Sequence, residues 1–357
     1  MRKQSVLVAM SGGVDSSIAA ALLKDQGYEV IAVTLKIWPE EYCTSHREKS
    51  CCSLQDIEDA KKVCGILGIR HYVLNFEKIF RKEVIDYFAR EYLSGRTPNP
   101  CIVCNEKIKF GRLLEKAEEL DCNFVSTGHY ARIEKNGAYR LKESVDKAKD
   151  QSYVLFSLSS IQLKKSLLPI GDLNKEKVRF KARELGLSVY KKSDSQEICF
   201  VPDGGYSDFI KKYCGIEIKK GDIVDGSGKR LGSHDGFWNF TIGQRKGLGI
   251  SYKSPLYVIG IEPKKNIIIV GGLGEVMKKR FAVKDINWLR EMDGDRFEAW
   301  VKIRYNHKKA KAFLKKVGRI IEVEFEKEQE AITPGQAAVF YSGEYVIGGG
   351  WIDRVLA

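Results

Sequence analysis

The chain has 357 residues, of which 43% are hydrophobic and 30% charged. This length allows two or three domains with well-buried cores, and the mixture is that of a globular protein, which excludes intrinsic disorder. Apolar runs fall short of the roughly 18 residues that a membrane span needs, and Met1-Arg2-Lys3 leads into a strand-like pattern without a signal-peptide cleavage site. We therefore expect a cytoplasmic protein with no membrane partner.

The charge and the cysteines narrow the function further. A formal net charge of +13 favours a polyanionic partner such as nucleic acid. Nine cysteines, an odd number over a long chain, argue against a secreted disulfide framework and for thiols, metal ligands or redox chemistry.

The first 130 residues alternate between strand and helix patterns. Apolar strand patterns lie at 5–10, 30–37, 71–76 and 123–129, and helical spacing lies at 14–26, 53–67, 77–93 and after Asn105. This alternation predicts an α/β domain with a parallel sheet covered by helices, and with ligands bound beyond the carboxyl ends of the strands.

From about Asp208 onward the pattern changes to short alternating segments. Turn pairs such as Asp225-Gly226 and Asp235-Gly236 separate them, and an earlier pair is Asn136-Gly137. We expect mostly β structure, with strands within 297–305, 320–326 and 337–352 forming a small barrel or sandwich. The predicted domains are a catalytic α/β domain at 1–205, a small central domain at 206–275 and a C-terminal β-barrel at 276–357.

The motif SGGVDSS, residues 11–17, lies at the first strand-to-helix turn. Glycines expose backbone N–H groups there and form an anion cradle that needs no lysine, and the serines add hydroxyl donors. Asp15 is a candidate ligand for Mg²⁺ carried by a nucleotide. A plain tight turn is the alternative, and the full motif in the first strand–helix unit favours the phosphate loop.

Three cysteines stand in two motifs. RTPNPCIVCNEKIKFG (96–111) holds Cys101 and Cys104, and DSQEICFVPDGG (194–205) holds Cys199. A thiolate near a helix N-terminus, or near lysines such as Lys107 and Lys109, is a nucleophile and a metal ligand. Taken alone, the CxxC pair is explained as well by half of a zinc site or two incidental thiols as by reactive thiols.

The other cysteines carry weaker signals. Cys43, Cys51 and Cys52 lie with His46 in a polar loop without metal-ligand spacing, which favours exposed thiols over a metal clip. For Cys64, Cys122 and Cys214 we expect core packing.

A basic run occupies residues 302–319, with eight Lys or Arg and no Asp or Glu, beside Trp300, Tyr305 and Phe313. Such a run binds phosphates in a salt-dependent way, and its aromatic rings can stack on unpaired bases. We favour RNA binding over a merely solvated basic face.

The motifs together resemble one family. SGGVDSS is similar to the loop of the ATP pyrophosphatases, and TPNPCxxCNxxIKFG, STGHYAR, KDQSYVLF, SQEICFV and FTIGQRKGLGI follow in the order typical of the tRNA-specific 2-thiouridylase family. The resemblance covers essentially the whole chain. It implies a sulfurtransferase that uses ATP and Mg²⁺ to adenylate the C2 oxygen of the wobble uridine in a tRNA anticodon stem-loop. Sulfur from a cysteine persulfide, supplied by a cysteine desulfurase relay, then replaces that oxygen, with AMP and pyrophosphate as the other products.

The resemblance also implies roles for single residues. Cys104 is the nucleophile and Cys199 carries the persulfide, while Asn99, Pro100 and Cys101 approach the target base. The ATP site comprises Ala9, Met10, Ser11, Gly12, Gly13, Val14, Asp15, Ser16, Leu35 and Gly128, where Leu35 replaces the Met expected of the family. The tRNA contacts are His129, Lys149, Asp150, Gln151, Arg304, Tyr305 and Gln336.

One departure from the family leaves the sulfur chemistry open. Many members carry Asp where this chain has Cys101, so Cys101, Cys104 and Cys199 could ligate a [4Fe–4S] cluster with one open position. We favour the persulfide over the cluster. Two further alternatives are another adenylating ATP pyrophosphatase, such as an amidotransferase-type synthetase or a tRNA lysidine-forming ligase, and a non-catalytic RNA-binding module.

Overall fold

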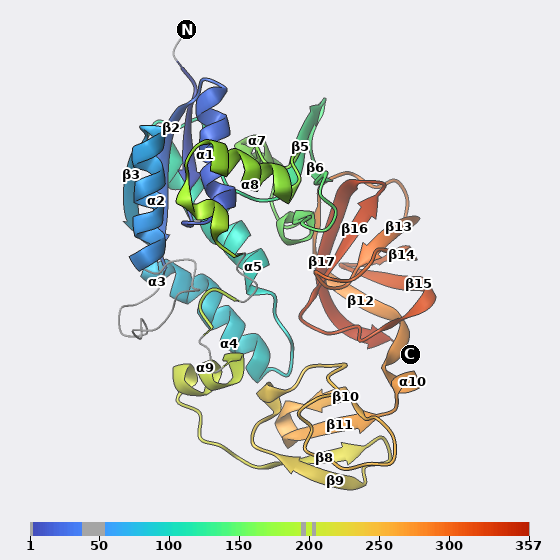
Figure 1. Ribbon diagram of the computed structural model, residues 1–357. Coiled ribbons are helices and arrows are strands. Elements are labelled where there is room, and N and C mark those ends of the chain that lie inside the picture. Colours follow the sequence, from blue (N-terminus) through green and yellow to red (C-terminus); the bar gives the residue numbers. More distant parts are fainter. Residues whose placement is uncertain (1–2, 38–53, 194–197, 202–204, 357) are drawn as a thin grey trace. The chain divides into compact units, whose positions relative to one another are not determined.

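The computed structural model describes residues 3–37, 54–193, 198–201 and 205–356 (Figure 1). The chain packs as two compact units, of which the first comprises 1–85, 101–200 and 344–347, and the second 86–100, 201–343 and 348–357. The loop with Cys43, His46, Cys51 and Cys52 lies outside the described residues. In the part of the chain that is described, no helix is long and apolar enough to cross a membrane. The division at 205 and 275 stays a prediction.

A five-stranded parallel sheet organises the first unit and confirms the expected α/β fold. The strand order is β3-β2-β1-β4-β7, and all four pairings are parallel. The strands are β1 (Ser5–Ala9), β2 (Glu29–Lys36), β3 (Arg70–Asn75), β4 (Phe124–Ser126) and β7 (Ser166–Leu167). The central strands β1 and β2 are almost continuously apolar and buried, as strands covered on both faces must be.

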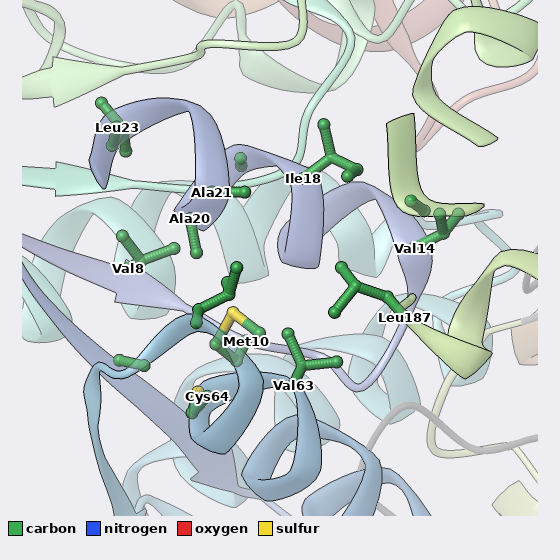
Figure 2. Close-up of a cluster of buried hydrophobic side chains, with 14 of the residues drawn as sticks. Val8, Met10, Val14, Ile18, Ala20, Ala21, Leu23, Val63, Cys64 and Leu187 are labelled. Atoms are coloured by element: carbon green, nitrogen blue, oxygen red, sulfur yellow. The ribbon is translucent and has the colours of Figure 1, made fainter. Parts of the chain in front are cut away.

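Helices α1 (Val14–Asp25), α2 (Leu54–Leu67) and α8 (Lys175–Glu184) pack their apolar faces into one core with the sheet (Figures 1 and 2). Val8 of β1 and Ile18 of α1 are fully buried there, and Val63 and Cys64 of α2 close the cluster. The prediction of core packing for Cys64 is confirmed, and burial raises the pKa of its thiol to about 11.

Cys122 is also buried, as predicted, but the prediction for Cys214 is wrong because this residue is exposed. Cys214 is the last residue of a helix, α9 (Gly205–Cys214), so the mostly β structure predicted from about Asp208 is confirmed but begins later, at Gly221. The helix buries Phe209 and Ile210 and exposes its C-terminal turn.

The predicted helix at 77–93 is three consecutive segments, α3 (Glu77–Phe80), the π-helical η2 (Arg81–Ile85) and α4 (Asp86–Leu93). The helix predicted after Asn105 begins earlier, with α5 (Pro100–Val103), and continues through the π-helical η3 (Cys104–Arg112) into α6 (Leu113–Glu119). The hairpin of β5 (Ala131–Asn136) and β6 (Ala138–Glu143) turns at Asn136-Gly137, as predicted. The short helices η4 (Ser152–Leu155), α7 (Ser160–Lys164) and η5 (Ser188–Lys191) complete this unit.

The second unit contains a small four-stranded sheet with the order β10-β11-β8-β9. Its strands are β8 (Gly221–Asp225), β9 (Arg230–His234), β10 (Tyr257–Glu262) and β11 (Ile267–Gly271). Ile223, Val258, Ile268 and Val270 are fully buried and form its own core. The linking helices are η6 (Phe237–Asn239), η7 (Pro263–Lys265) and α10 (Leu273–Val276).

Six antiparallel strands form a closed barrel in the order β12-β15-β14-β13-β16-β17, because β12 also pairs with β17. They are β12 (Met277–Trp288), β13 (Arg296–Lys302), β14 (Ala310–Val317), β15 (Ile320–Glu330), β16 (Ala337–Ser342) and β17 (Tyr345–Leu356). Phe281 and Phe325 meet in its interior with ring centroids 5.5 Å apart. The barrel is confirmed, and closure removes the exposed edges of an open sheet.

Candidate active site

The motif SGGVDSS forms a tight loop between β1 and α1. Gly13 is the N-cap of α1 and has no side chain to bond the first turn, so the backbone N–H groups of that turn are available to an anion. Ser16 Oγ accepts from the backbone N–H of Ser11 at 3.2 Å and donates to the Gly13 carbonyl at 3.1 Å. Ser17 Oγ donates to the same carbonyl at 2.8 Å. The hydroxyls therefore hold the loop in its curved shape.

Gly12 is required at its position for two reasons. Its φ of +69° is left-handed, and a Cβ there would lie 2.4 Å from the carbonyl oxygen of Asp56 at the start of α2. The Lys192 ammonium spans the same junction, with 3.2 Å to the Gly12 carbonyl, 2.5 Å to Asp56 Oδ1 and 2.9 Å to Asp59 Oδ2. This lysine ties the loop to α2.

Asp15, which we expected to face a magnesium ion, is engaged by two side chains of the same unit. Lys175 Nζ lies 2.9 and 2.8 Å from its two carboxylate oxygens, and the Tyr130 hydroxyl donates to Oδ1 at 2.7 Å. The carboxylate is a fitting oxygen ligand for Mg²⁺. Such an ion would share these oxygens with the Lys175 ammonium.

Gly128 follows β4 and lies against the loop, while Leu35 lies near the end of β2, the strand that pairs with β1. A Cβ on Gly128 would lie 2.5 Å from the backbone nitrogen of Ser16 and 2.6 Å from the carbonyl carbon of Asp15. Thr34, beside Leu35 near the end of β2, donates its hydroxyl to the Met10 carbonyl at 3.0 Å. Gly128 therefore lies next to the phosphate loop and Leu35 next to Thr34, and the contact of both with ATP stays a prediction.

The three motif cysteines differ in exposure. Cys101 in α5 is exposed, Cys104 at the start of η3 is buried, and Cys199 is half-buried. Cys199 is held by its neighbour Phe200, which is fully buried and packs edge-on against Phe80 with 5.7 Å between ring centroids. All three belong to the unit that carries the phosphate loop.

The π-helical segment η3 begins with Cys104 and is supported by side chains that the sequence analysis missed. Asn105 is buried and donates to the Val154 carbonyl at 2.9 Å. Gln162 of α7 donates to the carbonyls of Glu106 and Phe110 at 3.0 and 2.8 Å. Single π-turns inside helices are rare and cluster at functional sites, which fits a helix that begins with the predicted nucleophile.

An iron–sulfur cluster on Cys101, Cys104 and Cys199 stays an untested alternative. Within the described ranges, no three or more His, Cys, Asp or Glu side chains are close enough together to hold a metal ion, and this includes Cys101, Cys104 and Cys199. We derive no step through a cluster from this geometry.

His129, a predicted tRNA contact, is buried next to the end of β4. Its Nδ1 is 2.7 Å from the Thr127 hydroxyl, and its ring packs at 6.1 Å from that of Phe110. Burial, helped by the charge of Lys109, lowers the pKa of His129 well below its usual value. The ring is therefore neutral at physiological pH, so that it can contact RNA only as a neutral hydrogen-bonding group.

The side chains of Asp150 and Gln151, in the motif KDQSYVLF, form hydrogen bonds with neighbouring residues of the fold. Asp150 Oδ1 accepts from the backbone N–H of Ser144 at 2.9 Å, and Oδ2 accepts from the Ser152 hydroxyl at 2.7 Å. Gln151 and Tyr130 exchange two hydrogen bonds, of 2.7 and 2.9 Å. The segment is thereby fixed next to Tyr130, and Lys149 is its half-buried neighbour.

In the second unit, Gln336 holds the segment that precedes the predicted base contacts. Its Nε2 donates to the carbonyls of Thr97 and Pro98 at 3.0 and 3.3 Å, immediately before Asn99. The Thr97 hydroxyl donates at 3.2 Å to that of Thr241 in the motif FTIGQRKGLGI. This motif therefore supports the same segment.

Arg96 anchors the other end of this segment. Its guanidinium lies 2.8 Å from Glu91 Oε2 and donates to the backbone carbonyls of Ile352 and Asp353 at 2.9 and 3.1 Å. A planar group with five donors is well suited to bridge a helix and a barrel strand in this way.

The basic run at 302–319 is partly neutralised by the fold. On β14, the lysines point outward while Ala312 and Leu314 face the interior, and the neighbouring strand β15 brings acidic side chains alongside. Lys311 Nζ lies 3.7 Å from Glu326 Oε1. Trp300 is 40% exposed and Phe313 is 51% exposed, so the aromatic part of the predicted RNA surface is available for stacking.

Arg304 and Tyr305, the remaining predicted tRNA contacts, lie half-buried just after β13. Lys302 Nζ is 5.8 Å from the centre of the Tyr305 ring. Burial, followed by the charge of Arg304, lowers the pKa of the nearby His307 to about 4. The roles of Arg304 and Tyr305 stay predictions.

The site residues that sequence reasoning missed share one property. Each forms a side-chain hydrogen bond with a residue 49 to 180 positions away along the chain, and they are Asn105, Gln162, Lys175 and Lys192. The sequence contained a single hint of the lysines, which is that the phosphate loop itself has none.

Three family models match consecutive parts of the chain, and full-length relatives match nearly all of it. Residues 4–203 match the model of a tRNA methyl transferase HUP domain, residues 207–272 a tRNA methyl transferase PRC-barrel domain, and residues 278–352 an aminomethyltransferase beta-barrel domain. The tRNA-specific 2-thiouridylase MnmA of Clostridioides difficile is 47% identical over 358 residues, covering 99% of both chains. The proteins of the same name from Carboxydothermus hydrogenoformans and Heliobacterium modesticaldum are 48% and 49% identical, each over 99% of this chain and over 99% and 94% of the relative. The chain belongs to the tRNA-specific 2-thiouridylase family.

Proposed function

We propose that this protein is a tRNA-uridine 2-sulfurtransferase that thiolates the wobble uridine in the anticodon loop of tRNA. The observation that carries the proposal is the uncapped first turn of α1 behind SGGVDSS, in the same compact unit as Cys104 and Cys199. Full-length identity of 47% to a tRNA-specific 2-thiouridylase supports it. ATP and tRNA meet in the cytoplasm, where we place the enzyme.

The first step is adenylation. The C2 oxygen of the uridine attacks the α-phosphorus of ATP, and pyrophosphate leaves with the electron pair of the broken P–O bond. The N–H groups of the loop and the positive end of α1 stabilise the charge on the departing phosphates. Magnesium supplies further charge neutralisation when bound, and Asp15 is the loop residue that would hold it.

The second step transfers sulfur from a persulfide on Cys199. Its terminal sulfur attacks C2, and AMP leaves with the former C2 oxygen. The Cys104 thiolate then attacks the Cys199 sulfur, so that the electrons of the broken S–S bond stay on the 2-thiouridine. A Cys104–Cys199 disulfide remains, and an external thiol reductant must open it before a sulfur donor, such as a cysteine desulfurase relay, restores the persulfide.

The target base has to leave its stack to reach these groups. Flipping a base from an anticodon loop costs less than from a duplex, where pairing is also lost. Asn99, Pro100 and Cys101 are the residues that we propose to contact this base, and Gln336 holds Thr97 and Pro98 directly before them.

The test is thiolation of unmodified tRNA with ATP, Mg²⁺ and a persulfide donor, with product uridine analysed by mass spectrometry. We expect Cys104→Ser and Cys199→Ser each to abolish 2-thiouridine, and Cys199→Ser to leave tRNA-dependent pyrophosphate release intact. Exposed Cys214 offers a matched control, and Cys214→Ser should be as active as the wild type. Normal thiolation by Cys104→Ser would disprove the assignment of the nucleophile, and release of pyrophosphate with incorporation of nitrogen would point to another adenylating enzyme.

Cys101 separates the persulfide from the cluster. We expect Cys101→Asp, which introduces the residue of many family members, to retain thiolation in protein free of iron. The cluster would be supported if wild-type enzyme purified anaerobically contained about four irons per chain and the Cys101→Asp variant lost both the iron and the activity.

A further inference from the structure

The loop of the motif FTIGQRKGLGI carries positive charge that the reaction proposed above does not use. Together with the residues that follow it, up to 256, it contains Arg245, Lys246 and Lys253 but no Asp or Glu. All three side chains are exposed, and none of them has an ion pair or a hydrogen bond with the part of the chain that the structure describes. Resting on the function proposed above, we infer that this basic loop, residues 241–253, binds phosphates of the tRNA anticodon loop beside the target uridine.

The base of the loop is held by Gln244. Its backbone N–H donates to the Thr241 carbonyl at 3.0 Å, and its side chain accepts from the Thr241 N–H at 3.1 Å and donates to the Lys246 carbonyl at 3.0 Å. The Gln244 carbonyl accepts from the backbone N–H of Val258, in β10, at 3.0 Å. Because the loop is fixed to the small sheet in this way, Arg245 and Lys246 lose little backbone freedom when an anion binds.

The tip of the loop is shaped by Gly247 and Gly249. Both have left-handed backbones, with φ of +79° and +66°, and a Cβ on either would meet no backbone atom within 4 Å. Between them, Leu248 is buried in the core of the small sheet and anchors the tip. Within the described residues, the backbone N–H groups of 245–249 donate no hydrogen bond to another backbone group. Such N–H groups, beside two cations and open glycines, are the donors from which backbone anion sites are made.

The basic loop lies next to the segment that leads to the predicted base contacts. The Thr241 hydroxyl accepts from that of Thr97 at 3.2 Å, two residues before Asn99. The turn that Gln244 closes keeps its Cα within about 7 Å of that of Thr241, so the Arg245 backbone lies within about 11 Å of Thr241. RNA that presents its base to Asn99 therefore brings the phosphates next to that base within reach of the basic loop.

The chemistry of the basic loop favours RNA over an acidic protein as its partner. Its cations are uncompensated, unlike Lys311 on the barrel, which lies 3.7 Å from a carboxylate oxygen of Glu326. Unpaired cations that neutralise phosphates gain affinity by releasing the counterions of the nucleic acid. Tyr252, beside Lys253, is 46% exposed, and such a ring can stack on an unpaired base. Since phosphates carry no sequence information, the loop holds and orients the tRNA, and it does not select it.

Fluorescence anisotropy of whole tRNA and of the isolated anticodon stem-loop, titrated with full-length protein at about 50 to 200 mM salt, tests this inference without any sulfur chemistry. Arg245→Gln/Lys246→Gln should weaken binding of both RNAs about 10- to 100-fold at low salt. The slope of log K against log[salt] should become shallower by about 1.4, which is about 0.7 for each lost phosphate contact. ATP affinity and melting temperature should stay unchanged, because both side chains are exposed.

Two further variants serve as controls. Arg245→Lys/Lys246→Arg keeps both charges and should retain most of the affinity and the full salt dependence. Lys219→Gln/Lys220→Gln makes the same change in charge at two exposed lysines directly before β8 of the same sheet. This matched control should bind both RNAs within about twofold of the wild type.

Three results would overturn the inference while the proposed function stands. The first is wild-type RNA affinity and salt slope in Arg245→Gln/Lys246→Gln. The second is a loss of affinity for whole tRNA with unchanged binding of the stem-loop, which would place the contacted phosphates outside the anticodon loop. The third is intact RNA binding with slower thiolation from a protein sulfur donor, which would make the loop a protein-docking surface. If instead the wild type neither bound nor thiolated tRNA, the proposed function itself would fail.

Discussion

Replacing Gly128 by alanine tests whether the loop after β4 and the first turn of α1 form one rigid ATP site. The new Cβ would lie 2.5 Å from Ser16 N and 2.6 Å from the carbonyl carbon of Asp15, both backbone atoms that no rotamer change can move. Ordinary contact begins near 3.4 Å, so the two segments have to separate by about 0.9 Å. Overpacking of this kind costs about 1–3 kcal/mol of folding free energy.

We expect two measurable results. The melting temperature should fall by roughly 2–10 °C, as that loss of stability predicts for a unit of this size. ATP affinity should fall by more than stability alone would explain, because a displacement of about 1 Å at a binding site can reduce its function up to ~100-fold. Thermal unfolding and calorimetric titration with ATP check the two results on the same sample.

Gly65 in α2 is the matched control. A Cβ there meets nothing within 4 Å, and alanine is the better helix former by up to about 1 kcal/mol, so Gly65→Ala should be at least as stable as the wild type and bind ATP normally. The reasoning is refuted if Gly128→Ala keeps wild-type ATP affinity and melting temperature.

Three further predictions concern the second unit. Gln336→Leu removes the donor to the Thr97 and Pro98 carbonyls, so thiolation should slow at least ~10-fold with ATP affinity unchanged; an equal loss of ATP affinity would contradict this role. Burial lowers the pKa of His307 to about 4, so between pH 6.5 and 4 the unfolded chain binds a proton that the folded chain does not. In urea unfolding, the free energy of unfolding should therefore fall by up to about 3 kcal/mol as the pH is lowered from 6.5 to 4, and it should fall less steeply in His307→Gln. Identical pH profiles of the two proteins would contradict this role of His307. Trp300→Ala should weaken tRNA binding about 5- to 100-fold at unchanged melting temperature, and unaltered affinity in a filter-binding assay would exclude stacking there.

Local sequence was enough to determine the parts of the site that lie within one short segment. The apolar run of β1, the glycines and the helical spacing after them predict a phosphate loop at a strand-to-helix turn, because each of these signals acts over a few residues. The parallel sheet followed from the alternation of such units, and the barrel from short alternating strands. The π-helical segments were missed because their apolar spacing differs from that of an α-helix by too little to be read.

Tertiary structure alone decided which distant side chains complete the site. Lys175 stands 160 positions from Asp15, and nothing in its own segment marks it as a partner of the loop. The same holds for β15, whose acidic side chains partly neutralise the positive charge of the basic run at 302–319, a run that itself contains no acidic residue. The sequence gives the charge of each side chain. Its oppositely charged partner depends on strand order and helix packing, because these bring together residues that are far apart along the chain.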